Sequence, residues 1–209
     1  TFENEYFSPS VQNPFLREDR IYDRLRQGFN TNMGVEYFIT DKSSITAIGF
    51  FRSGDNKTVT TNNTSEFSEA NELAATSVRT ETETEDDQSY QLSLNYVNNF
   101  DSNGHKLIAD FQYENDEETE QSIIGEVRNF PNNMRLSSED IVNKENQEEY
   151  LAQVDYVLPL GENAQFEAGY RGTFEESVTD YLLLQEVGTS GIFLRNDYID
   201  SVYQAILDT

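Results

Sequence analysis

The sequence has no cysteine and a single histidine, His105, among its 209 residues. The absence of cysteine excludes disulfides, thiolate nucleophiles and cysteine-rich zinc or iron–sulfur sites. A lone His105 leaves no partner for a histidine-based metal site, and it is most simply a polar residue beside a turn. Paired carboxylates of the glycosidase type need a cleft, which nothing in the sequence indicates. We therefore expect the protein not to be an enzyme.

Basic residues and long apolar runs are also scarce. The chain has 14 Lys and Arg against 39 Asp and Glu, a formal charge of −25. Nucleic acids are held by clustered Lys and Arg, so this charge argues against a nucleic-acid partner. No stretch approaches the 18 apolar residues of a transmembrane helix. Low apolar content with high charge is typical of disorder, yet 12 % of the residues are aromatic, which disordered acidic segments lack. The arrangement of residues along the chain therefore has to show whether it folds.

Apolar and polar residues alternate with a period of two in several segments, which is the pattern of a β-strand with one wet face. The clearest alternating segments are 29–39, 90–96, 107–113, 150–158 and 164–174. A sixth run, 45–51, is apolar on both faces. Helical spacing does not compete with this pattern, and we also interpret 197–207 as a strand.

Two kinds of connection join these segments. Tight turns at 40–44, 101–104 and 159–163 carry the Asp, Asn, Gly and Pro residues that hairpins favour. Long polar and acidic excursions lie between them, at about 53–88, 115–147 and 175–196. Part of each excursion should continue as strand. The sequence therefore predicts an all-β antiparallel meander of long strands, with tight turns at one end and long acidic loops at the other.

This asymmetry favours an outer-membrane β-barrel over a soluble sandwich, because such barrels have short turns on one side and long loops on the other. The segment 164–174 has the length of one tilted crossing. Tyrosines at strand ends suit the aromatic girdles of a barrel: Tyr37, Tyr90, Tyr96, Tyr150 and Tyr156. The alternative is a soluble, extracellular, acidic β-sandwich that binds a partner or Ca²⁺.

Five strings in order carry a family resemblance: Gly-Val-Glu-Tyr-Phe-Ile at 34–39, Asn-Tyr-Val-Asn-Asn-Phe at 95–100, Gly-His-Lys-Leu at 104–107, Val-Asp-Tyr-Val-Leu-Pro-Leu at 154–160 and Phe-Glu-Ala-Gly-Tyr-Arg at 166–171. Over residues 17–209 the chain resembles the carboxy-terminal barrel of TonB-dependent-receptor-like outer-membrane proteins of the Bacteroidetes group. The resemblance implies localisation to the bacterial outer membrane, contact with its lipid, and uptake of a solute through a barrel that has an amino-terminal plug and is driven by the TonB system.

Strand counting suggests that residues 1–209 are a section of such a barrel rather than a whole one. Three tight hairpins supply six strands, the tail from Asn196 offers a seventh, and neither a plug domain nor a Ton box is visible. Eight strands are the minimum that closes; a complete small barrel is the alternative. An open section leaves unpaired sheet edges, so we expect an isolated section either to self-associate through them or to fold its apolar face onto itself.

The polar faces of the strands carry five charged residues that we expect to face the lumen: Glu36, Asp110, Asp155, Glu167 and Arg171. They would touch a plug or a solute, or else form a ladder of cross-strand partners. The nature of the solute, whether small molecule, glycan or peptide, is not encoded in any motif. Because loops on a rigid scaffold usually carry binding, we expect solute contact in the acidic excursions.

Two acidic clusters and one basic cluster complete the candidates. Residues 81–87 and 114–120 carry the acidic clusters Glu81, Glu83, Glu85, Asp86, Asp87 and Glu114, Asp116, Glu117, Glu118, Glu120. They would either bind Ca²⁺, which takes six to eight oxygens, or be simply solvated; no other cofactor is expected. The basic cluster is Arg17, Arg20, Arg24 and Arg26, which would pair with acidic loops or lipopolysaccharide, or mark the start of an exposed strand.

Overall fold

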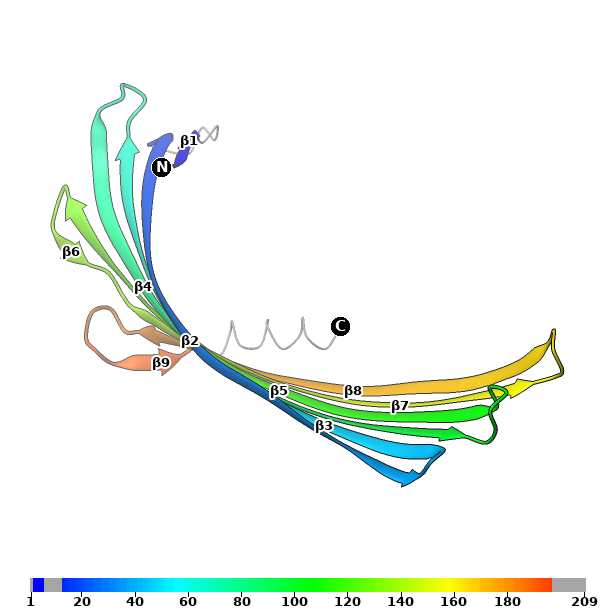
Figure 1. Ribbon diagram of the computed structural model, residues 1–209. Helices are drawn as coiled ribbons and strands as arrows, with labels where there is room; N and C mark the ends of the chain where they lie inside the picture. The colour runs from blue at the N-terminus through cyan, green and yellow to red at the C-terminus, as the bar shows by residue number, and fades with distance from the viewer. Residues whose placement is uncertain (1, 6–12, 197–209) are drawn as a thin grey trace.

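The computed structural model describes residues 2–5 and 13–196, which form a single antiparallel sheet (Figure 1). Six long strands make up the sheet: β2 (Phe15–Thr40), β3 (Ser43–Phe67), β4 (Leu73–Asn99), β5 (Lys106–Phe130), β7 (Glu139–Pro159) and β8 (Gln165–Glu186). Three short strands extend it: β1 (Phe2–Glu5), β6 (Met134–Arg135) and β9 (Phe193–Arg195). The predicted all-β meander is confirmed, and the strand predicted at 197–207 lies outside the described residues.

Neighbours in sequence are neighbours in the sheet, in the order β1-β2-β3-β4-β5-β7-β8-β9, with β6 paired to β5. All described strands belong to this one sheet, whereas a sandwich requires two sheets facing each other. The soluble-sandwich alternative is therefore wrong for the described part of the chain. Within that part, no helix is long and apolar enough to cross a membrane.

The three predicted tight turns lie together at one end of the sheet, which we call the inner end (Figure 1). The turn after Phe100 illustrates the chemistry: Asp101 Oδ1 accepts hydrogen bonds from the backbone N–H of Asn103 (2.8 Å) and His105 (3.2 Å). The bond from Asn103, above all, keeps the pKa of Asp101 below its usual range. Gly104 supplies the positive φ, 97°, that the turn needs.

At the outer end the structure differs from the sequence-based expectation. Most of each acidic excursion continues as strand, so that β3 has 25 residues and β4 has 27. The remaining connections are only 68–72, 131–138 (which contains β6) and 187–192. The long acidic loops are thus long acidic hairpins. In 80–85, Thr and Glu alternate, so neither face of this segment is apolar. Each of its residues nevertheless pairs with β3 on one side and with β5 on the other.

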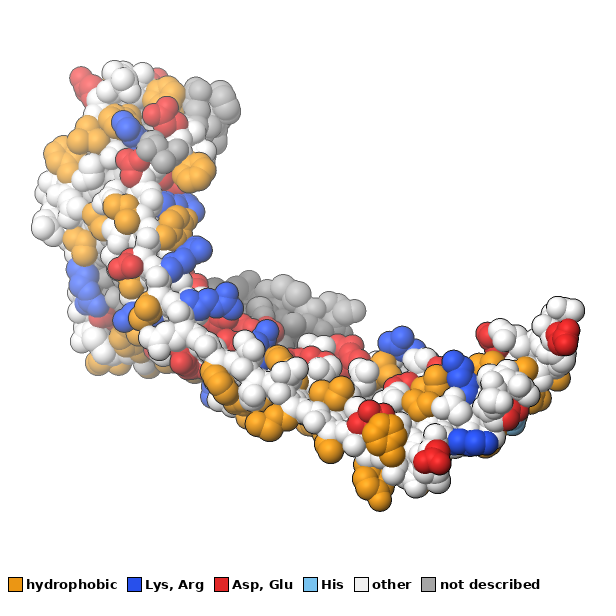
Figure 2. Space-filling view, viewed as in Figure 1, with side chains coloured by type: hydrophobic (Ala, Val, Ile, Leu, Met, Phe, Trp, Pro, Cys, Tyr) orange, Lys and Arg blue, Asp and Glu red, His pale blue; other side chains and the backbone are white. Residues whose placement is uncertain are grey.

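The sheet is curved, and its convex and concave faces carry different kinds of side chain (Figure 2). Towards the inner end, hydrophobic side chains gather on the convex side, while Asp, Glu, Lys and Arg line the concave side. Because side chains alternate across a strand, Val154 belongs to the convex face and its neighbour Gln153 to the concave face. Among the described apolar side chains only Ile124, Leu151 and Leu183 are buried. The sheet therefore has almost no core of its own.

Candidate functional site

A row of aromatic rings crosses the convex face, one from each long strand. We call it the outer girdle: Phe29, Phe51, Tyr90, Tyr113, Tyr150 and Phe174. Ring centroids are 5.2 Å apart for Phe51 and Tyr90 and 4.9 Å apart for Tyr113 and Tyr150. Phe29 extends the row to one edge and Phe174 to the other, at 6.5 and 6.4 Å from their neighbours. Rings at one height on all strands are the mark of a membrane–water interface.

A second aromatic row, the inner girdle, lies nearer the tight turns and consists of Tyr37, Tyr96, Tyr156 and Phe166. Its Tyr156 hydroxyl lies 2.9 Å from His105 Nε2, beside the turn after Phe100. The convex residues between the two girdles form an apolar belt that is well exposed, for example Met33 at 76 % and Tyr170 at 73 %. Exposed apolar area of this extent requires an apolar surrounding. The tyrosines predicted to form girdles all belong to one girdle or the other.

The girdles also record the tilt of the strands. Following register partners from Phe29 across the sheet leads to Val178, four positions outward of Phe174. The same path from Tyr37 leads to Tyr170, four positions outward of Phe166. Both boundaries therefore slope equally. With about 3.3 Å per residue and about 4.8 Å per strand, this slope corresponds to a strand tilt of roughly 30°, close to the tilt of membrane barrels.

On the concave face, at the height of the belt, three of the five predicted residues share one cross-strand row. Direct register partners run in the order Glu36, Thr46, Asn95, Asp110, Gln153, Arg171. Asn95 Nδ2 donates a hydrogen bond of 2.6 Å to Asp110 Oδ1. Asp155 and Glu167 lie two and four positions further inward on the same face, and accept hydrogen bonds from Gln153 and Gln165. All five residues thus share the face opposite the belt, in a polar cross-strand ladder.

Outward of the belt the concave face becomes strongly acidic. Asp87 and Glu145 flank Glu118 as its register partners, and Glu85 is the partner of Glu120. Burial, followed by repulsion from Glu85 and Glu145, raises the pKa of Glu118. Burial and then the neighbouring carboxylates, Glu83 first, raise the pKa of Glu120. Only one ion pair relieves this patch, from Arg52 Nε to Asp87 Oδ2 at 3.2 Å, among the residues described.

This acidic patch does not form a recognisable metal centre. Within the described residues, no three His, Asp or Glu side chains are grouped in a way that would hold a metal ion. Cross-strand carboxylates stand in rows along an open face rather than converging on a point. Binding of Ca²⁺, which the sequence left open as an alternative to simple solvation of these clusters, stays a prediction.

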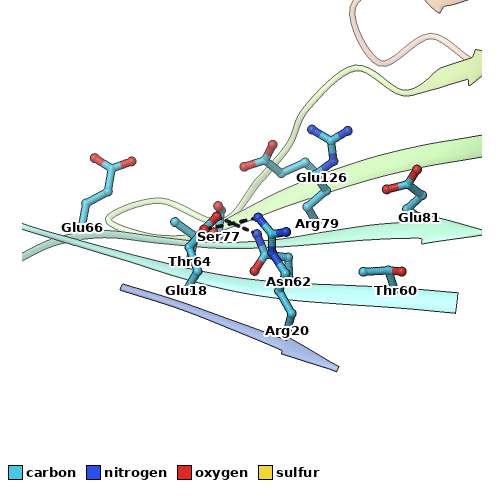
Figure 3. A pocket seen from close by; sticks show the side chains of 10 residues that line it. All are labelled: Glu18, Arg20, Thr60, Asn62, Thr64, Glu66, Ser77, Arg79, Glu81 and Glu126. Carbon is cyan, nitrogen blue, oxygen red and sulfur yellow. Dashed lines mark hydrogen bonds and ion pairs between the residues drawn. The ribbon is translucent and has the colours of Figure 1, made fainter. Parts of the chain in front are cut away.

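A hollow of about 430 Å³ lies at the outer end of the concave face, over β2, β3, β4 and β5 (Figure 3). Its lining is entirely polar: Glu18, Arg20, Thr60, Asn62, Thr64, Glu66, Ser77, Arg79, Glu81 and Glu126. In one wall of the hollow, Glu18 forms an ion pair with Arg20 at 3.3 Å and accepts a hydrogen bond of 2.9 Å from Asn62. The buried Asn62 Oδ1 has no hydrogen-bond partner among the described residues.

The predicted arginine cluster lies on β2, where alternation divides it between the faces. Arg20, Arg24 and Arg26 are on the concave face, while Arg17 is on the convex face and pairs with Asp19 at 3.9 Å. The guanidinium of Arg24 lies 5.2 Å from the ring of Tyr22. The helix-like spacing in the sequence is therefore incidental, and the strand interpretation of this segment is confirmed.

One ionic contact was not apparent from the sequence. Glu186, 3 % exposed, accepts hydrogen bonds from Arg135 through both carboxylate oxygens, at 3.0 and 2.8 Å. Its two oxygens also accept from the backbone N–H of Gly191 (2.7 Å) and Ser138 (3.0 Å). Burial acts to raise the pKa of Glu186, but these hydrogen bonds together outweigh it and lower the pKa. We call this set of contacts the clasp: it joins the connection 131–138 to the outer end of β8 and to Gly191, through Arg135 and Glu186, which are 51 positions apart in the sequence. No local motif signals it.

Comparison with known families agrees with this geometry. The model of the family described as outer membrane protein beta-barrel family matches residues 98–204, slightly more than half of the chain. No curated protein matches the sequence significantly.

Proposed function

Because the chain belongs to the outer membrane protein beta-barrel family and so lies in the bacterial outer membrane, we propose that it is a section of a TonB-dependent-receptor-like transport barrel. In this proposal the convex belt contacts lipid and the concave face lines the path of a solute. The parent protein adds a plug domain on the inner side and is driven by the TonB system. The role is binding and transport rather than catalysis.

The observation that carries the proposal is the contrast between the two faces at one height. Between the girdles, the convex face is apolar while the concave face carries Glu36, Asp110 and Arg171 in one row. A charged residue placed in lipid is costly, so these side chains need water or a polar partner. A water-filled lumen supplies water, and a plug or a solute inside it supplies polar partners. At the height of the belt, either of these would contact this row of charged residues.

Solute contact is proposed for the outer halves of the strands, above the outer girdle. The hollow of Figure 3 presents guanidinium, carboxylate, amide and hydroxyl groups from four adjacent strands. Such a mixture suits a polar solute that both donates and accepts hydrogen bonds. Small molecules, glycans and peptides all meet that description.

Membrane placement can be tested separately, because the chain contains no tryptophan. Single variants Ala168→Trp and Glu167→Trp place one indole on each face of β8. In vesicles of brominated phosphatidylcholine, we expect strong quenching at position 168 and weak quenching at position 167. Equal quenching at both positions would refute the assignment of the faces.

Transport itself is tested in cells that make the protein containing this chain. Uptake of labelled peptides, oligosaccharides and small polar solutes is compared with uptake in a deletion strain. We expect one class to depend on the protein and to stop when a protonophore collapses the proton-motive force. Uptake that persists without energy would indicate a passive pore instead.

A further inference from the structure

Three columns of side chains run side by side along the outer half of the concave face, one on each of three neighbouring strands. The arginine column on β2 consists of Arg20, Arg24 and Arg26. The carboxylate column on β4 consists of Glu81, Glu83 and Glu85. The neutral column on β3, which lies between them, consists of Asn56, Thr58, Thr60 and Asn62. Opposite charges therefore stand on the two sides of an uncharged strip.

The register of the sheet fixes how the columns face each other. One row of consecutive register partners consists of Arg24, Thr58 and Glu83. The next row inward consists of Arg26, Asn56 and Glu85. In each row two interstrand spacings, about 10 Å in all, separate the arginine from the glutamate. Asn56 Nδ2 donates a hydrogen bond of 3.2 Å to Glu85 Oε2, so the neutral column helps to orient the carboxylates.

The charges of the two columns are available to a solute. Arg24 and Arg26 are exposed, and among the described residues neither lies within ion-pair distance of a carboxylate. At the outward end of the columns, the hollow of Figure 3 has Thr60 of β3 between Arg20 of β2 and Glu81 of β4. Its volume of about 430 Å³ lies within the range of small-molecule sites.

We propose that this strip binds short linear peptides with free termini, with the terminal carboxylate towards the arginine column and the terminal ammonium towards the carboxylate column. The inference rests on the proposed function, in which the concave face lines the path of a solute, and it names the class of that solute. An extended chain spans at most about 3.3–3.6 Å per residue, so the end charges of a tripeptide lie up to about 10 Å apart. This length matches the separation of the two columns. The amides and hydroxyls of the neutral column both donate and accept hydrogen bonds, as the peptide groups between the termini require.

Other classes of solute use only part of this arrangement. A neutral glycan would leave both charged columns without a partner charge. A small anion would meet the arginine column alone, and the acidic patch around Glu118 and Glu120 would repel it. A single amino acid has opposite charges, but it is too short to reach both columns. A short peptide uses all three columns at once.

Binding is measured on isolated outer membranes, so that the result does not depend on energy or on transport. The membranes come from cells that make the protein containing this chain, and membranes of the deletion strain give the background. Tritium-labelled trialanine is the probe. We expect binding that depends on the protein, and that weakens about tenfold when the carboxyl terminus is amidated and about tenfold when the amino terminus is acetylated. Each modification removes one charge that a column binds.

Two double variants test which column binds which terminus. Arg24→Gln, Arg26→Gln should weaken trialanine binding and remove the effect of amidation, while the effect of acetylation persists. Glu83→Gln, Glu85→Gln should remove the effect of acetylation and keep that of amidation. A substitution that only disturbs the fold would weaken the binding of all these peptides together, without separating the two termini.

Matched controls remove the same charges from the convex face of the same three strands. Arg17→Gln, Lys57→Gln removes two positive charges, and Asp55→Asn, Asp86→Asn removes two negative charges. Both controls should bind trialanine as the wild type does, with both terminal effects intact. Equal weakening in the controls would overturn the assignment of binding to the columns.

The outcomes separate this inference from the proposed function. Equal binding of free and blocked trialanine would overturn the peptide site, as would absence of trialanine binding to a protein that takes up another solute; in the second case transport stands. Binding that depends on both termini, by a protein that takes up no solute, would support the peptide site and refute transport. Neither binding nor uptake would overturn both.

Discussion

The inner and outer halves of the same six strands are built for different surroundings. Between the girdles the two faces contrast, with Val154 and Tyr170 on the convex side and Gln153 and Arg171 on the concave side. Outward of the outer girdle both faces carry mainly polar residues, and carboxylates such as Glu118 and Glu145 stand opposite each other. Backbone pairing continues unchanged across the boundary. A β-sheet therefore needs apolar side chains only where its face meets lipid, since its ladder satisfies the backbone in both media.

The largest predicted effect follows from placing a charge in the belt. Val154→Arg puts a guanidinium on the convex face between the girdles, and should lower the free energy of unfolding in lipid vesicles by about 2–4 kcal/mol. The change is measured by urea titration, in which unfolding is monitored by near-ultraviolet circular dichroism. The chain has no tryptophan, so this signal comes from its tyrosines and phenylalanines.

Two controls separate lipid contact from a general effect of arginine. Gln153→Arg lies at the same height on the concave face, and Asn146→Arg lies on the convex face outside the outer girdle. Both should change the stability far less than Val154→Arg. If all three variants lose the same amount, the convex face is not the lipid face.

In the outer half, the clasp between Arg135 and Glu186 should be the most sensitive contact. Glu186→Gln removes the charge that binds Arg135 and two backbone N–H groups, and should lower the unfolding midpoint clearly. The exposed Glu176→Gln, on the same strand, should change it little. Hydrogen exchange should rise at 131–138 and 187–192 in Glu186→Gln and not elsewhere; a uniform rise would argue against a local clasp.

The clasp also has a defined pH dependence. Since the folded-state pKa of Glu186 is lowered, its contribution is present above the unfolded pKa and is lost as the pH falls through the lowered folded pKa. The stability difference between wild type and Glu186→Gln should therefore be largest near neutral pH and shrink in acid. A difference that grows on acidification would contradict this assignment.

The outer girdle, at the boundary between the halves, should contribute a moderate amount. Tyr150→Leu removes ring contacts with Tyr113 and Phe174 and should lower the free energy of unfolding by about 0.5–1.5 kcal/mol. Tyr170→Leu, within the belt, should have little effect, because Tyr170 makes no ring contact with any described residue. Unfolding of both variants in the same vesicles tests the comparison; equal losses would show that the girdle rings act singly.

The halves also differ in how far the sequence could predict them. Alternation at 90–96 or 164–174 identifies belt strands and their faces, and places Asp110 and Arg171 on one side, because a period of two is visible only where one face is apolar. In 53–58 and 115–122 both faces are polar, so the pattern disappears although the ladder continues. The link between Arg135 and Glu186 depends on the register of three strands, which no local pattern encodes.

The smallest predicted effect concerns repulsion within the acidic patch. The double variant Glu118→Gln, Glu120→Gln should raise the stability at neutral pH, by about 0.5 kcal/mol for each like-charged cross-strand pair removed. The folded-state pKa of both carboxyls is raised, so the folded chain binds protons more readily than the unfolded one. The destabilisation is then complete above the raised pKa and vanishes below the unfolded value. Wild type and variant should therefore converge as the pH falls, whereas Glu117→Gln, on the convex face, should show a smaller gain. A wild type that is more stable than the variant at neutral pH would instead mean that a bound cation stabilises these carboxylates more than their neighbours oppose them.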